Sequence, residues 1–207
     1  MSVRVIKLGG SLLACHDLPN MLARWSARQL PSPSLWVVGG GALSDQIRVL
    51  DRRFRLAPEL AHRLAIQAMA INSRVVAAWL PGSIWVDDID LFVRESAHDA
   101  TRPGVVNPVS VTAASDPPSR SRRLPPSWSV TSDSIAASVA WAVNAAELVL
   151  LKSCLPAAEG GTTRAQAATA GYVDPYFPRS ARHVGRVRAV NLRDPQFPEM
   201  CLEVDGS

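Results

Sequence analysis

The chain has 207 residues, of which 47% are hydrophobic and 19% are charged, and its formal net charge is +4 at pH 7. This length and composition fit a globular domain with a sizeable core, and they exclude a disordered chain. No apolar run approaches the roughly 18 residues of a membrane span, and the first residues open into a strand pattern without the layout of a signal peptide, so we expect a cytoplasmic protein with no membrane partner.

The cysteines and the basic residues indicate which compartment and which partners the sequence favours. The three cysteines show no paired spacing, no C-x-x-C motif and no set of histidine ligands around them, which favours a reducing compartment and predicts no metal site. The only tight basic cluster, Arg120, Arg122 and Arg123, lies in a Ser/Pro stretch and favours a solvated loop over a nucleic-acid partner. Of the 22 basic residues only two are lysines, Lys7 and Lys152, so their positions deserve separate consideration.

Short segments rich in valine, isoleucine and leucine alternate with helical patterns along the chain. The strand segments are apolar almost throughout, as expected for strands that are covered on both faces. Strand, glycine break and helix repeat at least twice, which predicts an α/β fold, a three-layer αβα sandwich with a mainly parallel open sheet. The predicted strands cover residues 3–8, 35–38, 84–86, 105–111, 147–151, 187–192 and 200–204, and the predicted helices cover residues 17–30, 42–50, 58–80, 88–93, 132–143 and 163–170.

Three local signals refine these elements. Asp17 is a candidate N-cap for the helix over residues 17–30. Pro108 falls inside the strand over residues 105–111, which favours an edge strand or a bend there. Residues 116–126 hold four prolines and three arginines, which predicts a loop or a hinge between two lobes.

Two glycine loops are the first candidate site. Gly9-Gly10-Ser11 follows a buried strand and Lys7, and Gly39-Gly40-Gly41 follows the next strand. Glycines let the backbone approach an anion closely, and the N–H groups at a helix start attract negative charge. A plain strand-to-helix turn is the alternative for each loop. Neither loop is a Walker A motif, in which the lysine follows the glycines, or a dinucleotide fingerprint.

Three further positions carry charges that suit an anion site. Arg48, two turns into the helix after the second loop, is a candidate for binding an anionic substrate group, or else a surface arginine. Asp133 would hold the ammonium of Lys7 if the two lie close together; otherwise it belongs to ordinary helix capping. Lys152 ends a buried strand, at the edge where ligands bind in open α/β sheets, unless it is merely solvated.

The order K-L-G-G-S, V-V-G-G-G, V-T-S-D-S-I-A-A and L-L-K-S resembles the amino acid kinase superfamily, which includes acetylglutamate, aspartate, uridylate and isopentenyl phosphate kinases. The resemblance covers most of residues 3–153. It implies a small-molecule substrate, with ATP and Mg²⁺ as cofactors. It also implies one domain over residues 1–207, with an acceptor-binding lobe over about 1–125 and a nucleotide-binding lobe over about 126–207. We further expect a homo-oligomer.

The resemblance also implies roles for individual residues. Lys7 would bind the transferred phosphoryl group, and Asp133 would organise the charged side chains around it, which makes these two the catalytic pair. No residues are assigned to a metal. The phosphate- and nucleotide-binding residues would be Gly9, Gly10, Ser11, Gly40, Gly41, Lys152 and Ser153, and the substrate-binding residues would be Gly39, Arg48 and Ser132.

The short length and the segment G-Y-V-D-P-Y-F-P, residues 171–178, are similar to a small branch of this superfamily. Its members phosphorylate (5-(aminomethyl)furan-3-yl)methyl phosphate to the diphosphate in methanofuran biosynthesis. Many superfamily members carry a further downstream lysine that touches the transferring phosphate, whereas this chain has no lysine after Lys152. Either Lys152 or an arginine such as Arg179 would take its place.

Several alternatives stay open at this point. The acceptor could instead be an amino acid carboxylate, a nucleoside monophosphate or isopentenyl phosphate. The chain could also be a non-catalytic nucleotide or phosphate sensor that kept the fold, for which the missing downstream lysine argues. A structural subunit of a larger assembly is a third reading, motivated by six tryptophans and the apolar helix over residues 58–80.

Overall fold

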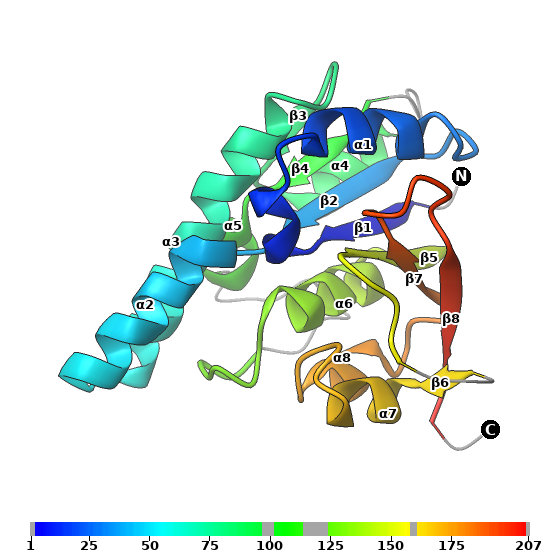
Figure 1. Ribbon diagram of the computed structural model, residues 1–207. Helices are drawn as coiled ribbons and strands as arrows, with labels where there is room; N and C mark the ends of the chain where they lie inside the picture. The colour runs from blue at the N-terminus through cyan, green and yellow to red at the C-terminus, as the bar shows by residue number, and fades with distance from the viewer. Residues whose placement is uncertain (1–2, 97–101, 114–123, 158–160, 206–207) are drawn as a thin grey trace.

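The structure, a computed structural model, describes residues 3–96, 102–113, 124–157 and 161–205. One open sheet, with its strands in the order β3-β4-β2-β1-β5-β7-β8-β6, runs through the molecule between helices (Figure 1). Neighbouring strands are parallel except β7 and β8, which are antiparallel. This is the predicted three-layer α/β fold. The strands are β1 Arg4–Leu8, β2 Ser34–Val38, β3 Ile84–Val86, β4 Gly104–Val106, β5 Glu147–Lys152, β6 Thr162–Thr163, β7 Val187–Asn191 and β8 Glu199–Glu203.

Helices cover both faces of this sheet (Figure 1). α1 lies on one face, and α6 packs against β1, β2 and β5 on the other, with α7 and α8 beyond it. Within the described residues, no helix combines the length and the apolar character needed to cross a membrane. The helices are the 3-10 helix η1 Gly10–Ala14, α1 Leu18–Ser26, α2 Gly41–Phe54, α3 Pro58–Ala77, α4 Ile89–Glu95, α5 Pro108–Ala113, α6 Ser132–Ala142, α7 Arg164–Thr169 and α8 Phe177–Ala181.

Alternation along β1 decides which helix layer each of its side chains meets, because successive residues of a strand point to opposite faces. Val5 belongs to the core beneath α6, together with Ile135 of that helix. Ile6 and Leu8 belong to the other core, beneath α1. Lys7 stands two positions after Val5, so its side chain lies on the α6 face of the sheet.

The helices α2 and α3 form an antiparallel pair that extends beyond the carboxyl edge of the central strands (Figure 1). α2 has no fully buried residue, although its charged and apolar positions are segregated as in an amphipathic helix. Leu50 and Phe54 of α2 are 45% and 61% exposed. One face of α2 is therefore apolar and open.

The prediction of a strand over residues 105–111 is wrong in its second half. The strand β4 ends at Val106, and α5 begins at Pro108. The side-chain oxygen of Asn107 accepts a hydrogen bond from the N–H of Val109, at 3.1 Å. A proline in the first turn of a helix sacrifices no hydrogen bond, because the N–H there has no partner within the helix. Pro108 therefore starts a helix and does not bend a strand.

Smaller differences concern helix ends. The helices predicted over residues 17–30 and 58–80 end earlier, at Ser26 and Ala77. Asp17 stands at the N-cap position of α1, but its carboxylate accepts from the side chain of Asn20 at 2.6 Å and caps no backbone N–H. The arginine cluster at residues 120–123 and most of the loop predicted over residues 116–126 lie outside the described residues. Residues 124–126 of that loop are described.

Candidate active site

The two glycine loops are in contact, because they follow neighbouring parallel strands. Leu8 at the end of β1 is in register with Val38 at the end of β2. A Cβ atom added to Gly10 would stand 2.3 Å from the backbone nitrogen of Gly41, and one added to Gly39 would stand 2.7 Å from the nitrogen of Gly10. Any side chain at these positions would separate the loops, so the close approach requires glycine.

Both loops open a helix whose first turn has no side-chain cap. η1 begins at Gly10 and α2 begins at Gly41, and in neither case does a side chain at the N-cap accept from the backbone. The N–H groups of a first helical turn have no acceptor within the helix and carry partial positive charge. The loops therefore offer backbone donors at their junction, an arrangement that binds phosphate oxygens well.

Asn72 of α3 fixes the second loop from behind. Its side-chain nitrogen donates to the carbonyl oxygens of Gly39 and Gly40, at 2.9 and 2.8 Å. Asn72 is buried on the same face of α3 as Met69 and Val76. Sequence reasoning missed Asn72, although an asparagine at a position that the apolar spacing of α3 assigns to the core is a signal that could have found it.

Three buried charged side chains meet beside the loops. Lys7 and Asp133 are only 3% and 5% exposed. The Nζ atom of Lys7 lies 2.8 Å from Oδ1 of Asp133, an ion pair whose angles fall outside hydrogen-bond geometry. The Nζ atom of Lys152 donates to Oδ2 of Asp133 at 2.9 Å and to the carbonyl oxygen of Tyr172 at 2.7 Å. We call Lys7, Asp133 and Lys152 the charge cluster.

Strand alternation explains why the two lysines reach the same carboxylate. Lys152 ends β5, next to β1 in the sheet, and lies on the same face as Leu148 and Leu150, which pack beneath α6. Asp133 lies in the first turn of α6, above this face. The two lysines of the chain thus converge on one aspartate, as the functional interpretation of Asp133 requires.

Burial and mutual attraction set the protonation of the charge cluster. Burial lowers the pKa of Lys7 to about 8, with a further contribution from the charge of Lys152, although Asp133 opposes the shift. Burial alone would raise the pKa of Asp133, but the positive charges of the two lysines, together with the hydrogen bond from Lys152, hold it at about 2. Two ammonium groups around one carboxylate leave an excess of positive charge, which can stabilise an anion.

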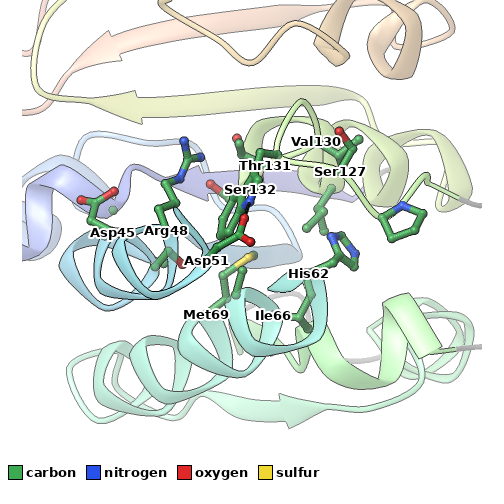
Figure 2. Close-up of a pocket in the computed structure, with 18 of the residues that line it drawn as sticks. Asp45, Arg48, Asp51, His62, Ile66, Met69, Ser127, Val130, Thr131 and Ser132 are labelled. Atoms are coloured by element: carbon green, nitrogen blue, oxygen red, sulfur yellow. Dashed lines mark hydrogen bonds between the residues drawn. The ribbon is translucent and has the colours of Figure 1, made fainter. Parts of the chain in front are cut away.

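A cavity of about 670 Å³ adjoins the loops. Figure 2 shows Arg48 and Asp51 on one side of it and Thr131 and Ser132 across from them. His62 of α3 also lines the cavity, half-buried, and burial lowers its pKa below the ordinary value of 6.5. Of the predicted site residues, those lining the cavity are Gly10, Ser11, Gly40, Gly41, Arg48 and Ser132.

The other predicted site residues lie around the charge cluster and not on the cavity wall. Gly9 donates its N–H to the carbonyl oxygen of Leu151 at 2.8 Å, so it joins the first loop to β5. Gly39 lies against Gly10. Ser153 follows Lys152 and is half-buried. Of the two residues considered as substitutes for a downstream lysine, Lys152 contacts Asp133, whereas Arg179 is exposed and lies over the ring of Tyr176.

Arg48, Trp128 and Asp51 form one contact group in the cavity wall. The guanidinium of Arg48 lies over the indole of Trp128, 4.6 Å from the ring centroid. The indole nitrogen of Trp128 donates to Oδ2 of Asp51 at 2.6 Å. Within the described part of the chain, the buried Nε of Arg48 has no hydrogen-bond partner. This donor therefore has no acceptor in the described part of the protein. Sequence reasoning missed Trp128 and Asp51, which lie 77 positions apart.

The glycine loops offer backbone donors, but the described residues form no metal site. Among the described residues, no group of three or more His, Cys, Asp or Glu is placed to hold a metal ion. Both carboxylate oxygens of Asp133 face lysines. The described residues therefore offer Mg²⁺ no site of their own. Proteins commonly bind this ion largely through the phosphates of a nucleotide.

Comparisons with known proteins cover most of the chain. No curated protein matches its sequence significantly. Three solved structures share its fold at identities that bear on the fold alone. They are uridylate kinase from Archaeoglobus fulgidus (TM-score 0.61, 16% identity, 91% of this chain and 90% of that one), UMP kinase from Ureaplasma parvum (0.65, 14%, 97% and 98%) and UMP kinase from Bacillus anthracis (0.63, 11%, 94% and 88%).

The sequence model of the amino acid kinase family matches residues 2–154. This span includes both glycine loops, α6 and the whole of β5, and therefore every residue of the charge cluster. Because the match extends over most of the chain and over the elements that build the site, the chain belongs to the amino acid kinase family.

Proposed function

We propose that the protein is an ATP-dependent kinase that transfers the γ-phosphoryl group of ATP to a phosphate acceptor. The observation that carries this proposal is the convergence of Lys7 and Lys152 on Asp133, beside two glycine loops that touch each other. Phosphoryl transfer needs little covalent chemistry from a protein; it needs positioning and neutralisation of the transferred charge. Ammonium groups and uncapped backbone N–H groups supply both.

In this proposal the acceptor occupies the cavity beside α2 and α3, and the nucleotide binds next to Lys152 and Ser153, within the lobe over about residues 126–207. The glycine loops hold phosphates of both substrates. Lys7 stabilises the negative charge on the transferred group, and Asp133 keeps the two ammonium groups in place. An acceptor phosphate is already ionised at neutral pH, so the reaction needs no general base.

We further propose that the acceptor is an aminomethylfuran methyl phosphate, in the biosynthesis of a methanofuran-type cofactor. The free Nε of Arg48 supports binding of an anionic group. The indole of Trp128 and the side chains of Ile66 and Met69 line the same cavity and suit a flat, largely apolar ring. Asp45 lines it too and can pair with an ammonium group. A volume of about 670 Å³ leaves room for this acceptor.

A panel of acceptors tests the proposal. ADP release would be measured with ATP, Mg²⁺ and, in separate reactions, the aminomethylfuran methyl phosphate, uridine monophosphate, isopentenyl phosphate or an amino acid. We expect the highest kcat/KM with the furan compound. Uridine monophosphate is the second candidate, because the three similar structures are uridylate kinases. Nucleotide binding without ADP release on any acceptor would favour a non-catalytic sensor.

We also propose that the protein forms a homo-oligomer in the cytoplasm, where ATP is available. Leu43, Leu50 and Phe54 of α2 are exposed and recur at helical spacing, so they form an apolar strip on a helix with no buried residue. Light scattering with and without ATP tests this. A mass of 22.3 kDa, that of one chain, at every concentration would contradict it.

A further inference from the structure

The segment 171–178 carries a buried carboxylate that the proposed mechanism does not use. Asp174 lies between α7 and α8 and is 6% exposed. No lysine or arginine forms an ion pair with it among the described residues. A buried charge without a partner is costly unless hydrogen bonds satisfy it. Its partners therefore indicate what this segment does.

Asp174 caps α6 from a distant part of the chain. Its Oδ2 atom accepts from the N–H and the hydroxyl of Thr131, at 3.0 and 2.8 Å, and from the N–H of Ser134 at 3.0 Å. Its Oδ1 atom accepts from the hydroxyl of Ser134 at 2.5 Å and from the N–H of Tyr176 at 3.1 Å. Thr131, the N-cap residue, does not cap α6 with its own side chain. Asp174 takes over that role, and the helix start stabilises its negative charge.

The segment 171–178 also forms a hydrogen bond with one lysine of the charge cluster. Two residues before Asp174, the carbonyl oxygen of Tyr172 accepts from Nζ of Lys152 at 2.7 Å. Asp133 lies between Thr131 and Ser134, the two residues that Asp174 binds. Residues 172–174 therefore fix both partners of the contact between Asp133 and Lys152: the aspartate through the helix start, and the lysine through a carbonyl.

We propose that Asp174 is a positioning residue that holds the first turn of α6 so that Asp133 meets Lys7 and Lys152 together. Lys7 and Lys152 extend from the sheet, whereas Asp133 belongs to a helix packed on it. The distances from Asp133 to the two lysines therefore depend on where α6 begins. Displacing that turn would lengthen both contacts at once. The role of Asp174 in phosphoryl transfer rests on the proposed kinase function. The effect of Asp174 on the geometry of the charge cluster does not.

The two lysines make the charge cluster directly observable. Because Lys7 and Lys152 are the only lysines in the sequence, selective ¹³C labelling of lysine side chains gives two NMR signals. Both signals can be followed against pH without any substrate. The charged groups that act on Lys7 are Asp133 on α6, Lys152 on β5 and Asp174 itself. In the wild type we expect Lys7 to titrate near pH 8.

Two variants distinguish the effect of the position of α6 from the effect of the charge of Asp174. Asp174→Asn removes the negative charge and replaces one of the two acceptor oxygens by an NH₂ donor. The double variant Thr131→Val/Ser134→Ala removes two hydroxyl donors but leaves Asp174 charged. In both we expect the titration of Lys7 to move to lower pH, because Asp133 no longer lies beside its ammonium. Thr163→Ala is the control: it removes the side-chain cap of α7, outside the cluster, and should leave the titration unchanged.

Turnover gives the second measurement. We expect kcat to fall by about 10- to 100-fold in both variants, since small displacements of catalytic groups have effects of this size, with KM for ATP unchanged. A wild-type Lys7 titration in both folded variants would overturn the proposal. A shift in Asp174→Asn alone would also overturn it, because Asp174 would then act through its charge only. If Asp174→Asn does not fold, the double variant decides. Shifted titrations in a protein that never transfers phosphoryl groups would refute the kinase function and leave the positioning role standing.

Discussion

Replacing Lys7 by methionine should change how the stability of the protein depends on pH. Methionine keeps the length of the buried side chain and removes the ammonium. The folded wild type releases the Lys7 proton above about pH 8, whereas the unfolded chain holds it up to about pH 10.5. Between these values the unfolded chain binds more protons, so the free energy of unfolding rises with pH. Below pH 8 both states are protonated, and Lys7 adds no pH dependence.

The structure gives the size of this effect. The interval from 10.5 to about 8, at about 1.4 kcal/mol for each pKa unit, corresponds to about 3 kcal/mol. Urea unfolding of the wild type and of Lys7→Met at pH 7, 8, 9 and 10, under reducing conditions, measures the difference. All other titrating groups are common to both proteins. The wild type should gain stability relative to the variant only above pH 8. Parallel curves, or a relative loss, would refute the argument that Lys7 is a buried ammonium.

Three further substitutions test the site. Asp133→Asn should lower kcat by about 100- to 1,000-fold with a modest change in the affinity for ATP, measured by steady-state kinetics and calorimetry; the opposite pattern would reduce Asp133 to a helix cap. Gly10→Ala places a Cβ atom 2.3 Å from the nitrogen of Gly41 and should abolish ADP release. Gly185→Ala is the control, because its Cβ atom meets nothing within 4 Å, and it should keep ADP release. Equal activities of the two variants would contradict the contact between the loops. Arg48→Ala should raise KM for the acceptor by about 10- to 100-fold and leave KM for ATP unchanged, and an unchanged acceptor KM would place the acceptor elsewhere.

Most of the fold follows from local patterns in the sequence. Continuous apolar segments that end at glycines mark β1 and β2, and parallel strands that end together explain why their loops meet. Alternation places Lys7 on the face of the sheet that α6 covers. What local reasoning could not exclude was ordinary capping by Asp133, because the V-T-S-D-S segment has the composition of a helix start. The contact with Lys7 and Lys152 meets the structural condition of the functional interpretation, and the catalytic role of Asp133 stays a prediction.

The missed residues act across long distances in the chain. Asp174 caps a helix that starts 42 positions earlier, at Ser132, and no capping pattern in the sequence describes a cap supplied from elsewhere. Trp128 meets Asp51 and Arg48 only because the loop before α6 returns over α2. The incorrect strand at residues 107–111 has a local cause, since Asn107 and Pro108 together form a good helix start. Contacts between distant segments therefore decide the structural features that local propensity does not determine.

The most direct test follows phosphoryl transfer by ³¹P NMR with ATP, Mg²⁺ and the best acceptor of the panel. The wild type should convert ATP to ADP and a phosphorylated acceptor. Lys7→Ala should show no transfer while its circular dichroism spectrum stays that of the wild type, and Lys7→Arg should be nearly as inactive, because a guanidinium does not reproduce the compact ammonium beside Asp133. Full transfer by Lys7→Ala would contradict the account.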